Sequence, residues 1–515
     1  MKVFNAAQIK RWDAYTIEQD YIPSIDLMER AATACFNWIV NKFGPLLFHK
    51  ADGPKKSFCI FCGKGNNGGD GLAIARLLLD HDYDTSIYII APDKKGSKDF
   101  EINLERLQGT TATIHFINEA ASIPLIGKNQ IVIDALFGTG LNKPVDAVAA
   151  TLIQHINQSM ATVISIDIPS GMFADKSSVG LPVVKANITL SFEGYKTCFL
   201  LPENEQQSGE VHILGIGLNK DFATNEPALF TFSDRSVIKE FFRPRKIFSH
   251  KGNLGHALLI AGSYGKTGAA QLAAKACLRS GVGLLSIHVP EKANDILQAT
   301  VPEAMTLTGQ IIPANIYACA GIGPGLGTTP EVVILVNNVI NNIQQLTADK
   351  PVPANICKLV IDADALNILS ANKSLLNNLP GQTILTPHPK EFERLFGKSA
   401  NDFDRITLAL QEAASLNCFI ILKGHYSFIA TPTGEGYFNS TGNAGMATGG
   451  SGDVLTGMLT GLASQGYSPL ETCLLGVYLH GLAGDLAAET LSQEAMIAGD
   501  IIDYIGKAFK SLSDT

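Results

Sequence analysis

The sequence predicts an α/β protein with two domains, each built on a doubly wound sheet of mostly parallel strands with helices on both faces. The chain has 515 residues, which is too long for one ordinary core, because domains cluster near ~100–200 residues. Short, continuous apolar runs alternate with helical stretches in both halves of the chain, and this alternation is typical of parallel sheets. Turn-forming residues interrupt it once. We therefore predict domains at 1–218 and 240–515, joined by a linker at 219–239.

In the first domain, the opening ~45 residues are predicted to form two helices. Asn5 can cap the first helix and Ser24 can cap the second. Each later apolar run is short enough for a buried strand and is followed by a helical stretch. We expect strands at Ser57–Cys62, Thr85–Ile90, Thr113–Phe116, Gln130–Asp134, Thr162–Asp167 and Ala186–Phe192, with helices such as Gly69–Asp80 and Ser97–Gln108 between them.

The second domain repeats this alternation after the turn-rich segment that contains Asn225, Pro227 and Pro244. Its tail, residues 451–510, has a mostly helical pattern. Strands are expected at His256–Ala261, Leu284–Val289, Tyr317–Ala320, Leu359–Ile361, Thr383–Leu385 and Phe419–Leu422, with a helix at Gly268–Gly281.

The composition excludes several classes of protein. Lys and Arg total 40 and Asp and Glu total 48, so the net charge is −8, which argues against general binding to nucleic acid or anionic membranes. Hydrophobic residues make up 46% and charged residues 17%, as in packed globular proteins. The first 20 residues lack the apolar region of a signal peptide. The uncharged stretch Ala147–Ile166 has polar residues at its centre, so we expect no membrane span there.

The nine cysteines are scattered along the chain, which is typical of buried thiols in a cytoplasmic protein. Cys59 and Cys62 form a CxxC pair inside an apolar run. A zinc site would need a second pair, and none is present. We interpret these two thiols as core residues.

Three polar loops of the first domain follow predicted strands. Gly63, Gly65 and Gly68 fit the pattern GxGxxG between a strand and a helix, where backbone N–H groups can hold a phosphate. That motif alone is weak evidence, and a purely structural turn is the alternative. The other two loops, Asp134–Pro144 and Asp167–Gly171, leave the same edge of the sheet, where ligands bind in open α/β folds. Together, the three loops predict one ligand site.

The motifs GKGNNGGDG, IDALFGTGLNKP and DIPSG in these loops resemble the NAD(P)H-hydrate epimerase domain family, which has a Rossmann-like fold, over about residues 1–218. The segment after Ser191, Glu193–Phe199, departs from the family pattern. The resemblance implies potassium ligands at Asn67, Asp134 and Ser170, and it makes Asp167 the candidate acid/base. It implies that the substrate is held by Asn66, Asn67, Gly68, Gly69, Asp70, Gly138, Thr139, Gly140, Leu141, Asn142, Lys143, Pro144 and Asp167.

The second domain has two Gly-rich loops. Ala261–Ala270 contains Gly-Lys-Thr, but a P-loop needs glycine where Ile260 stands, so a phosphate-binding turn of another type is favoured. Thr448–Asp453 opens a helical stretch, and N–H groups there can neutralise charge on a phosphate. Asp453 could take a proton from an attacking hydroxyl, although an Asp in the first turn of a helix is often only a favourable charge.

The second domain resembles the ribokinase-like kinases, and more closely the ADP- or ATP-dependent NAD(P)H-hydrate dehydratases, over about residues 240–510. The motifs HKGNLG, AGIGPG, DADAL, TPHPKE, LKG and GGSGD carry this resemblance. It implies that Glu391 organises magnesium near the phosphates. It implies substrate contacts at Ala269, Gly323, His388 and Asp453, and nucleotide contacts at Lys423, Gly424, His425, Tyr426, Ser427 and Gly452.

Together the halves resemble the bacterial bifunctional NAD(P)H-hydrate repair enzymes. The resemblance implies epimerisation of R and S hydrates and dehydration of the S hydrate with ADP or ATP. It also implies potassium and magnesium as cofactors. From the composition we expect a cytoplasmic protein without nucleic-acid or membrane partners, and we expect a homo-oligomer. Two alternatives stay open: a small-alcohol kinase of the hydroxymethylpyrimidine type with a regulatory dinucleotide-binding domain, and a non-enzymatic interaction module in the first half.

Overall fold

The computed structural model describes residues 1–48, 56–90, 95–110, 112–309, 316–349 and 358–513. The chain forms two compact units. One comprises Lys2–Ala228 with Asn401–Phe403, and the other comprises Leu229–Ala400 with Asp404–Thr515 and Met1. We describe each unit by itself, and both have the predicted α/β architecture.

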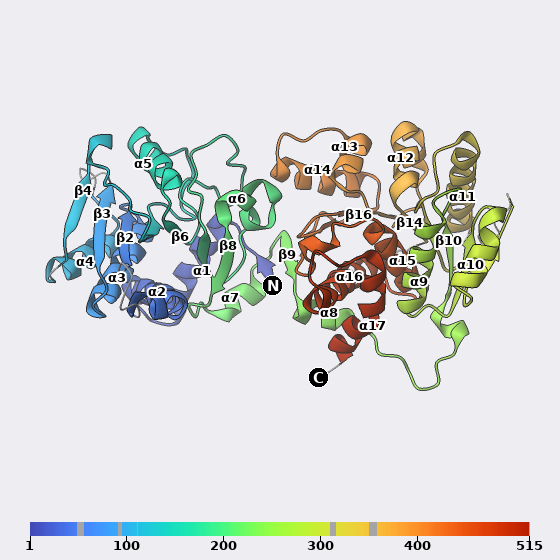
Figure 1. Cartoon of the computed structure of the whole chain (residues 1–515), viewed down its shortest axis with the longest axis horizontal. Helices are drawn as coiled ribbons and strands as arrows, with labels where there is room; N and C mark the ends of the chain where they lie inside the picture. The colour runs from blue at the N-terminus through green and yellow to red at the C-terminus, as the bar shows by residue number, and fades with distance from the viewer. Residues whose placement is uncertain (49–55, 91–94, 111, 310–315, 350–357, 514–515) are drawn as a thin grey trace. The chain divides into compact units, whose positions relative to one another are not determined.

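The N-terminal unit contains a sheet of seven parallel strands within the described residues, in the order β4-β3-β2-β5-β6-β7-β8. The order reverses between β2 and β5, so the loops after these two strands border the switch point where doubly wound sheets bind ligands. The strands, labelled in Figure 1, are β2 (Ser57–Cys62), β3 (Thr85–Ile90), β4 (Ile114–Ile117), β5 (Gln130–Ala135), β6 (Thr162–Ile166), β7 (Ile188–Phe192) and β8 (Glu210–Leu214).

All six strands predicted in this half are present, with small shifts at their ends. The last residue predicted for β6, Asp167, lies outside the strand because its φ of +67° breaks the extended conformation. Strand β8 was not predicted; it lies at an edge of the sheet and its residues are only partly buried. The helices are α1 (Ala6–Gln19), α2 (Ser24–Phe48), α3 (Asn66–Asp80), α4 (Lys98–Gln108), α5 (Ala147–Gln158), α6 (Glu205–Ser208) and α7 (Lys220–Asn225).

The two predicted helix caps differ in outcome. Asn5 caps α1: its side chain accepts a hydrogen bond from the Gln8 backbone N–H at 2.9 Å, and the Gln8 side chain accepts from the Asn5 N–H at 3.1 Å. Ser24 is instead the first residue of α2, and its hydroxyl donates to Asp99 Oδ1 at 2.9 Å. The prediction that Ser24 caps from outside the helix was wrong, because the helix starts one residue earlier.

The C-terminal unit contains a mixed sheet with the strand order β9-β18-β17-β16-β15-β14-β13-β10-β11-β12. Strand β17 is antiparallel to both of its neighbours, and the other pairs are parallel. The strands are β9 (Phe230–Ser233), β10 (His256–Ile260), β11 (Leu284–His288), β12 (Met305–Leu307), β13 (Cys319–Ile322), β14 (Leu359–Ile361), β15 (Ile384–Leu385), β16 (Phe419–Leu422), β17 (Phe428–Ala430) and β18 (Gly436–Asn439).

The strands predicted in this half are present, with β13 starting two residues later than expected. Strands β9, β12, β17 and β18 were not predicted. The helices are α8 (Arg235–Phe241), α9 (Thr267–Arg279), α10 (Asn294–Thr300), α11 (Pro330–Asp349), α12 (Ala363–Ala371), α13 (Pro389–Phe396), α14 (Asp402–Ser415), α15 (Ser451–Ser464), α16 (Pro469–Leu491) and α17 (Ala498–Ser513).

The segment 219–239, which we predicted to be a linker, is folded. It holds α7, β9 and most of α8, and the division between the compact units falls after Ala228. Strand β9 pairs with β18 in parallel. Asp234 caps α8 by accepting hydrogen bonds from the N–H groups of Ser236 and Val237 at 3.0 and 3.2 Å. The limits of the two domains as separate folding units stay a prediction.

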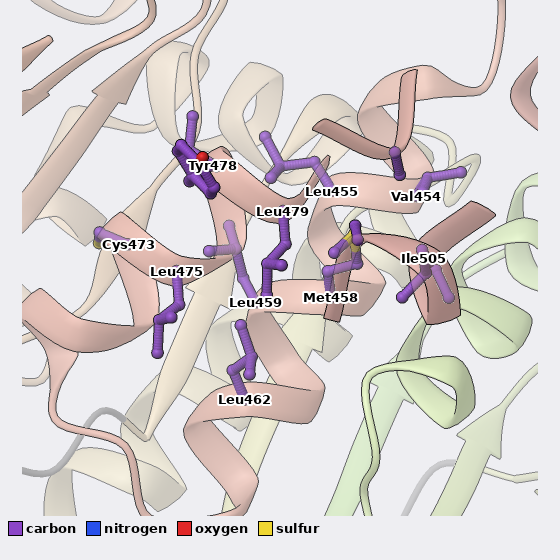
Figure 2. Close-up of a cluster of buried hydrophobic side chains, with 14 of the residues drawn as sticks. Val454, Leu455, Met458, Leu459, Leu462, Cys473, Leu475, Tyr478, Leu479 and Ile505 are labelled. Atoms are coloured by element: carbon purple, nitrogen blue, oxygen red, sulfur yellow. The ribbon is translucent and has the colours of Figure 1, made fainter. Parts of the chain in front are cut away.

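The core of the C-terminal unit is centred on α15. This helix packs against α9, α16 and strands β10, β13 and β14 (Figure 1). In the close-up, side chains of α15 such as Leu455 and Leu459 lie against Leu479 of α16 (Figure 2). Eleven successive residues of α15 from Val454 are buried, so the helix that carries the Gly-rich motif at its start is fixed on all sides.

Cys59 and Cys62 lie in β2 and are almost fully buried. Burial raises the pKa of the Cys59 thiol to about 12, as expected for a core cysteine. All eight cysteines within the described residues are buried. Among the described helices, none combines the length and the apolar character that crossing a bilayer would require.

Gly457 tests the packing of α15. A Cβ at this position would lie 2.1 Å from the Ala273 carbonyl oxygen of α9, because the two helices touch through their backbones. We predict that Gly457→Ala lowers the free energy of unfolding by ~1–3 kcal/mol, as overpacking does. The control is Gly506→Ala in α17, where nothing lies near the new Cβ and the change should be neutral or stabilising. Urea unfolding at an unchanged midpoint for Gly457→Ala would contradict this account of the core.

Candidate functional sites

In the N-terminal unit, the loops after β2 and β5 meet through their backbones. A Cβ on Gly63 would lie 1.9 Å from the Leu136 carbonyl oxygen, and a Cβ on Gly68 would lie 1.8 Å from that of Gly63. Only glycine permits both approaches. The N–H groups at the start of α3, whose N-cap is Gly65, therefore lie at the switch point, where they can face an anion.

Asp134, at the end of β5, ties three neighbouring segments together. Its carboxylate is fully buried and accepts hydrogen bonds from the Ser165 hydroxyl at 2.7 Å, the Ser170 hydroxyl at 2.5 Å and the Ser170 N–H at 2.9 Å. Burial raises its pKa, and these hydrogen bonds oppose the rise. Two of the predicted cation ligands, Asp134 and Ser170, are thus in direct contact.

Asp167 stands directly after β6 with a φ of +67°, a conformation that few non-glycine residues adopt. Its Oδ2 accepts a hydrogen bond from the Thr139 N–H at 2.8 Å, and its Oδ1 lies 3.1 Å from Lys196 Nζ. Lys196 is 1% exposed and also donates to the Ser191 hydroxyl at 2.6 Å. The unusual backbone conformation of Asp167 therefore positions its carboxylate between the Thr139 N–H and the ammonium of buried Lys196.

Lys196 was not predicted as a site residue. It lies in Glu193–Phe199, the segment that departs from the family pattern. A lysine between Tyr195 and the buried run Thr197–Leu200 was the available signal, because a charged side chain inside a buried segment needs a partner.

Asn67 brings an unsatisfied amide to the same place. It is 8% exposed, yet neither its Oδ1 nor its Nδ2 has a hydrogen-bond partner among the described residues. A Cβ on Gly138 would lie 3.3 Å from Asn67 Cγ and 2.7 Å from Asp167 Oδ2, so the three predicted residues meet. Unpaired buried amide atoms cost free energy, which a bound ion or substrate would offset.

The other predicted contacts of this site differ in position. Asp70 is half-buried, and burial, Asp167 and Asp13 together hold its pKa well above the usual value for a carboxyl group. Asn66 and residues 142–144 are exposed. Asn142 contacts Lys176, whose Nζ donates to the Asn142 carbonyl at 3.1 Å. The structure thus gathers Asn67, Gly138, Thr139 and Asp167, and leaves the outer part of the second loop open to solvent.

In the C-terminal unit, the loops after β10 and β13 are hydrogen-bonded to each other. The Gly262 N–H donates to the Pro324 carbonyl at 2.8 Å, and the Ser263 hydroxyl donates to that of Gly325 at 2.8 Å. A Cβ on Gly323, whose φ is +130°, would lie 1.8 Å from the Asp362 carbonyl oxygen. A Cβ on Gly325 would lie 2.8 Å from Ala269 Cβ, so the predicted substrate contacts Ala269 and Gly323 belong to one group of loops.

Asp362, directly after β14, is a buried carboxylate that accepts hydrogen bonds from neighbouring segments, as Asp134 does in the first unit. It is 1% exposed and accepts hydrogen bonds from Lys423 Nζ at 2.8 Å and Thr456 Oγ1 at 2.7 Å. Lys423 Nζ also lies 3.9 Å from Glu391 Oε2. Asp362 belongs to the DADAL motif, but we did not predict it as a site residue. The sequence signal that could have identified it is a carboxylate directly after a buried strand.

Asp453 lies in the first turn of α15 beside this ion pair. A Cβ on the preceding Gly452 would lie 3.6 Å from both Asp362 Oδ2 and Lys423 Nζ. Burial raises the pKa of Asp453 to about 6, the Asp362 carboxylate adds to the rise, and Lys423 opposes it. Asp453 is thus a carboxylate of raised basicity at a Gly-rich helix start.

His388 and Glu391 form the capping box of α13. His388 Nδ1 accepts hydrogen bonds from the N–H groups of Lys390 and Glu391, and Glu391 Oε2 accepts from the His388 N–H at 2.9 Å. His388 therefore has a structural role as the N-cap of α13. Its other ring nitrogen, Nε2, lies 3.5 Å from Glu391 Oε1. The predicted nucleotide loop forms a turn in which the Gly424 N–H donates to Ser427 Oγ at 3.2 Å, and Gly424 and His425 are exposed.

Comparisons with known proteins agree with the two-unit arrangement. Residues 257–507 match the model of a family described as NAD(P)H-hydrate dehydratase, and residues 24–198 match one described as YjeF-related protein N-terminus. The chain is 34% identical to the bifunctional NAD(P)H-hydrate repair enzyme of Moorella thermoacetica over 540 aligned residues, covering 100% of this chain and 98% of that protein. It is 30% identical to the corresponding Escherichia coli enzyme, covering 98% and 93% of the two chains.

A solved structure also resembles the C-terminal part. It is the ADP/ATP-dependent NAD(P)H-hydrate dehydratase of Bacillus subtilis, co-crystallised with ATP and Mg²⁺. The identity is 32%, the TM-score is 0.46, and the match covers 55% of this chain and 98% of that one.

Proposed function

The chain belongs to the family of bifunctional NAD(P)H-hydrate repair enzymes, and from this premise we propose how its residues divide the work. The protein combines an NAD(P)H-hydrate epimerase with an ADP- or ATP-dependent NAD(P)H-hydrate dehydratase. The sequence predictions of family, fold class and activity are confirmed. Residue roles, potassium and oligomeric state stay proposals.

The chemistry explains why a kinase fold serves a dehydratase. The damaged cofactor carries a hydroxyl at C6 of the nicotinamide ring, where water has added across the 5,6 double bond. Hydroxide leaves poorly near neutral pH, whereas phosphate leaves well. Once the hydroxyl is phosphorylated, the lone pair of the ring nitrogen expels phosphate, and loss of a proton from C5 restores NADH or NADPH.

The observation that carries the dehydratase proposal is Asp453 in the first turn of α15, next to Lys423 and Asp362. We propose that Asp453 takes the proton of the C6 hydroxyl as that oxygen attacks the terminal phosphate of the nucleotide. A pKa of about 6 leaves most of the groups ionised at neutral pH while keeping them basic. The N–H groups of Gly452 and its neighbours face the transferred phosphate.

Lys423 and Glu391 are proposed to support the nucleotide. The Lys423 ammonium, held by Asp362, sets a positive charge beside the first turn of α15. Glu391 is 6% exposed and one of its oxygens is engaged by the His388 N–H, which fits an indirect role in holding magnesium through water. When bound, magnesium would neutralise charge on the phosphates during transfer.

In the N-terminal unit we propose that Asp167 moves protons at C6 while the loops at the switch point hold the dinucleotide. The ion pair with buried Lys196 and the hydrogen bond from the Thr139 N–H hold the Asp167 carboxyl group in place. The start of α3 offers N–H groups to a phosphate of the substrate.

We also propose a monovalent cation at Asn67, Asp134 and Ser170. These residues supply only oxygen ligands, which suit a hard ion such as potassium. Two observations support the fit: the unpartnered amide oxygen of buried Asn67, and a buried Asp134 whose hydrogen-bond donors within the described residues are all uncharged.

The two alternatives are disfavoured. A small-alcohol kinase would release a stable phosphorylated product, whereas the relatives matched along the whole chain are repair enzymes. An interaction module in the first half would need neither the buried Asp134–Ser170 hydrogen bonds nor the ion pair of Asp167 with buried Lys196.

Substitution of Asp453 tests the dehydratase proposal. Asp453→Asn should lower nucleotide-dependent dehydration of the S hydrate by ~10²–10⁴-fold, as expected for loss of a positioned general base, and should leave epimerisation unchanged. In the wild type, dehydration should fall as the pH drops through about 6, because protonation removes the base. Recovery of the dihydronicotinamide absorbance measures the rate. The control is Asp503→Asn on the exposed side of α17, and near-normal dehydration by Asp453→Asn would remove this residue from the mechanism.

The second prediction concerns the cation. Replacing potassium with tetramethylammonium should slow epimerisation, and potassium should raise the thermal midpoint of the wild type by binding the folded state. Asn67→Ala should weaken both effects, whereas Asn37→Ala, on an exposed part of α2, should not. An identical rate and midpoint in both salts, with no ion density in a crystal structure, would contradict the site.

A further inference from the structure

Helix α1 brings another carboxyl group, that of Asp13, to the epimerase site. Ala6, the first residue of α1, packs against the cluster that contains Ile168 and Met172, and its N–H donates to Asp175 Oδ2 at 2.8 Å. Asp13 comes seven residues later, which is two helical turns, so it lies on the same face of α1 as Ala6. That face is the one turned toward the loop that begins with Asp167.

The other end of α1 is fixed as well. Thr16 is fully buried, and its hydroxyl oxygen accepts a hydrogen bond from the Asn219 N–H at 3.0 Å. The indole N–H of Trp12 donates to the Asn219 carbonyl at 2.7 Å. Asp13 lies between these two anchors and one turn from Thr16, so helical movement cannot easily carry its carboxyl group away from the site.

Asp13 is half-buried, and no hydrogen bond or ion pair satisfies its carboxyl group within the described residues. The charged groups that interact electrostatically with it are Asp167, Lys196 and Glu193, together with Asp70 of α3. Glu193 is already engaged, because one of its oxygens accepts hydrogen bonds from the N–H groups of Ile216 and Leu218 at 2.6 and 3.1 Å. Burial raises the pKa of Asp13 to about 7, Asp167 and Glu193 add to the rise, and Lys196 opposes it.

The carboxyl groups of Asp13 and Asp167 therefore lie near one site but have different surroundings. Lys196 Nζ lies 3.1 Å from Asp167 Oδ1, whereas Asp13 forms no ion pair within the described residues. Environments that separate two carboxyl groups in this way assign one as the base and the other as the acid.

We propose that Asp13 is the general acid of the epimerase site and works together with Asp167. This proposal rests on the role proposed above for Asp167. Asp13 donates its proton to the C6 hydroxyl, the C6–O bond breaks with its electron pair going to oxygen, and water leaves. The lone pair of the ring nitrogen forms the N1=C6 double bond. Water then adds to the opposite face of C6, its proton goes to Asp167, and the electron pair of the double bond returns to nitrogen.

Proton balance follows from this scheme. One turnover moves the single shared proton from Asp13 to Asp167, and the reverse reaction moves it back; exchange with solvent also resets the pair. The active enzyme carries one proton on the two carboxyl groups in either direction. Epimerisation should therefore fall on the alkaline side of about pH 7, where Asp13 loses that proton.

The test uses the full-length protein without nucleotide and follows R–S interconversion by NMR. Asp13→Asn should lower kcat/KM for epimerisation by ~10²–10⁴-fold and should abolish the alkaline fall near pH 7. Asp13→Glu should recover part of the rate and the alkaline fall. The matched control is Glu18→Gln, on the exposed side of the same helix, which should behave as the wild type. Nucleotide-dependent dehydration of the S hydrate and the thermal midpoint, measured in the same preparations, report on folding.

Two results would overturn the proposal: an Asp13→Asn rate within about threefold of the wild type, or a reduced rate that keeps the same alkaline fall, which a merely structural role would give. Asp167→Asn separates this proposal from the one it rests on. If Asp167→Asn is inactive while Asp13→Asn is active, only the role of Asp13 is wrong. If Asp167→Asn is fully active, Asp167 is not the base of the site. The proposal that Asp13 and Asp167 work as an acid–base pair is then wrong as well.

A second measurement checks the bond that breaks. In water labelled with oxygen-18, each enzymatic epimerisation should place the label at C6, above the exchange seen without enzyme. Epimerised product without label would overturn the proposed step, because the C6–O bond would then have stayed intact.

Discussion

A buried carboxylate at the end of a central strand needs hydrogen-bond donors, and this need organises both sites. Asp134 and Asp362 are 0% and 1% exposed, and an isolated charge at such depth would cost several kcal/mol. Neighbouring segments supply the donors: Ser165 of β6 and Ser170 of the following loop in the first unit, and Lys423 after β16 and Thr456 of α15 in the second. Each carboxylate thereby fixes loops that come from different strands, which is what a site assembled at one edge of a sheet requires.

The same arrangement sets the chemistry of the groups around it. In the second unit, burial and then the neighbouring Asp362 raise the pKa of Asp453, and Lys423 opposes the rise. In the first unit, Asp167 acts on Asp13 in the same direction, with Lys196 opposing. Glycine at positions 63, 68 and 323 allows the backbones of the site loops to approach one another closely. In the second unit, the buried carboxylate of Asp362 thus also acts on the carboxyl group proposed as the base.

Features that depend on residues close together in the sequence could be predicted. Contacts between residues that only the fold brings together could not. Apolar runs located the predicted strands because each run is buried on its own, and Asn5 was recognisable as a cap because its partner Gln8 is three residues away. Motifs located the loops around Asn67, Asp167 and Asp453. Lys196 and Asp362 were missed because their roles come from partners that the fold brings in, 29 residues away for Lys196–Asp167 and 61 for Lys423–Asp362. The segment 219–239 has turn-forming residues, but β9 is stabilised by pairing with β18, about 200 residues later in the chain.

Backbone hydrogen exchange of the wild type, Asp134→Asn and Asp362→Asn tests the organising role of the buried carboxylates most directly. We expect Asp134→Asn to speed exchange at Ser170 and in the loop after β5, and Asp362→Asn to speed exchange at the start of α15 and around Lys423. In each case the other unit should keep its wild-type protection. Unchanged protection of these loops, or faster exchange spread evenly over the mutated unit, would contradict this role. The carboxylates would then not be what holds the loops in place.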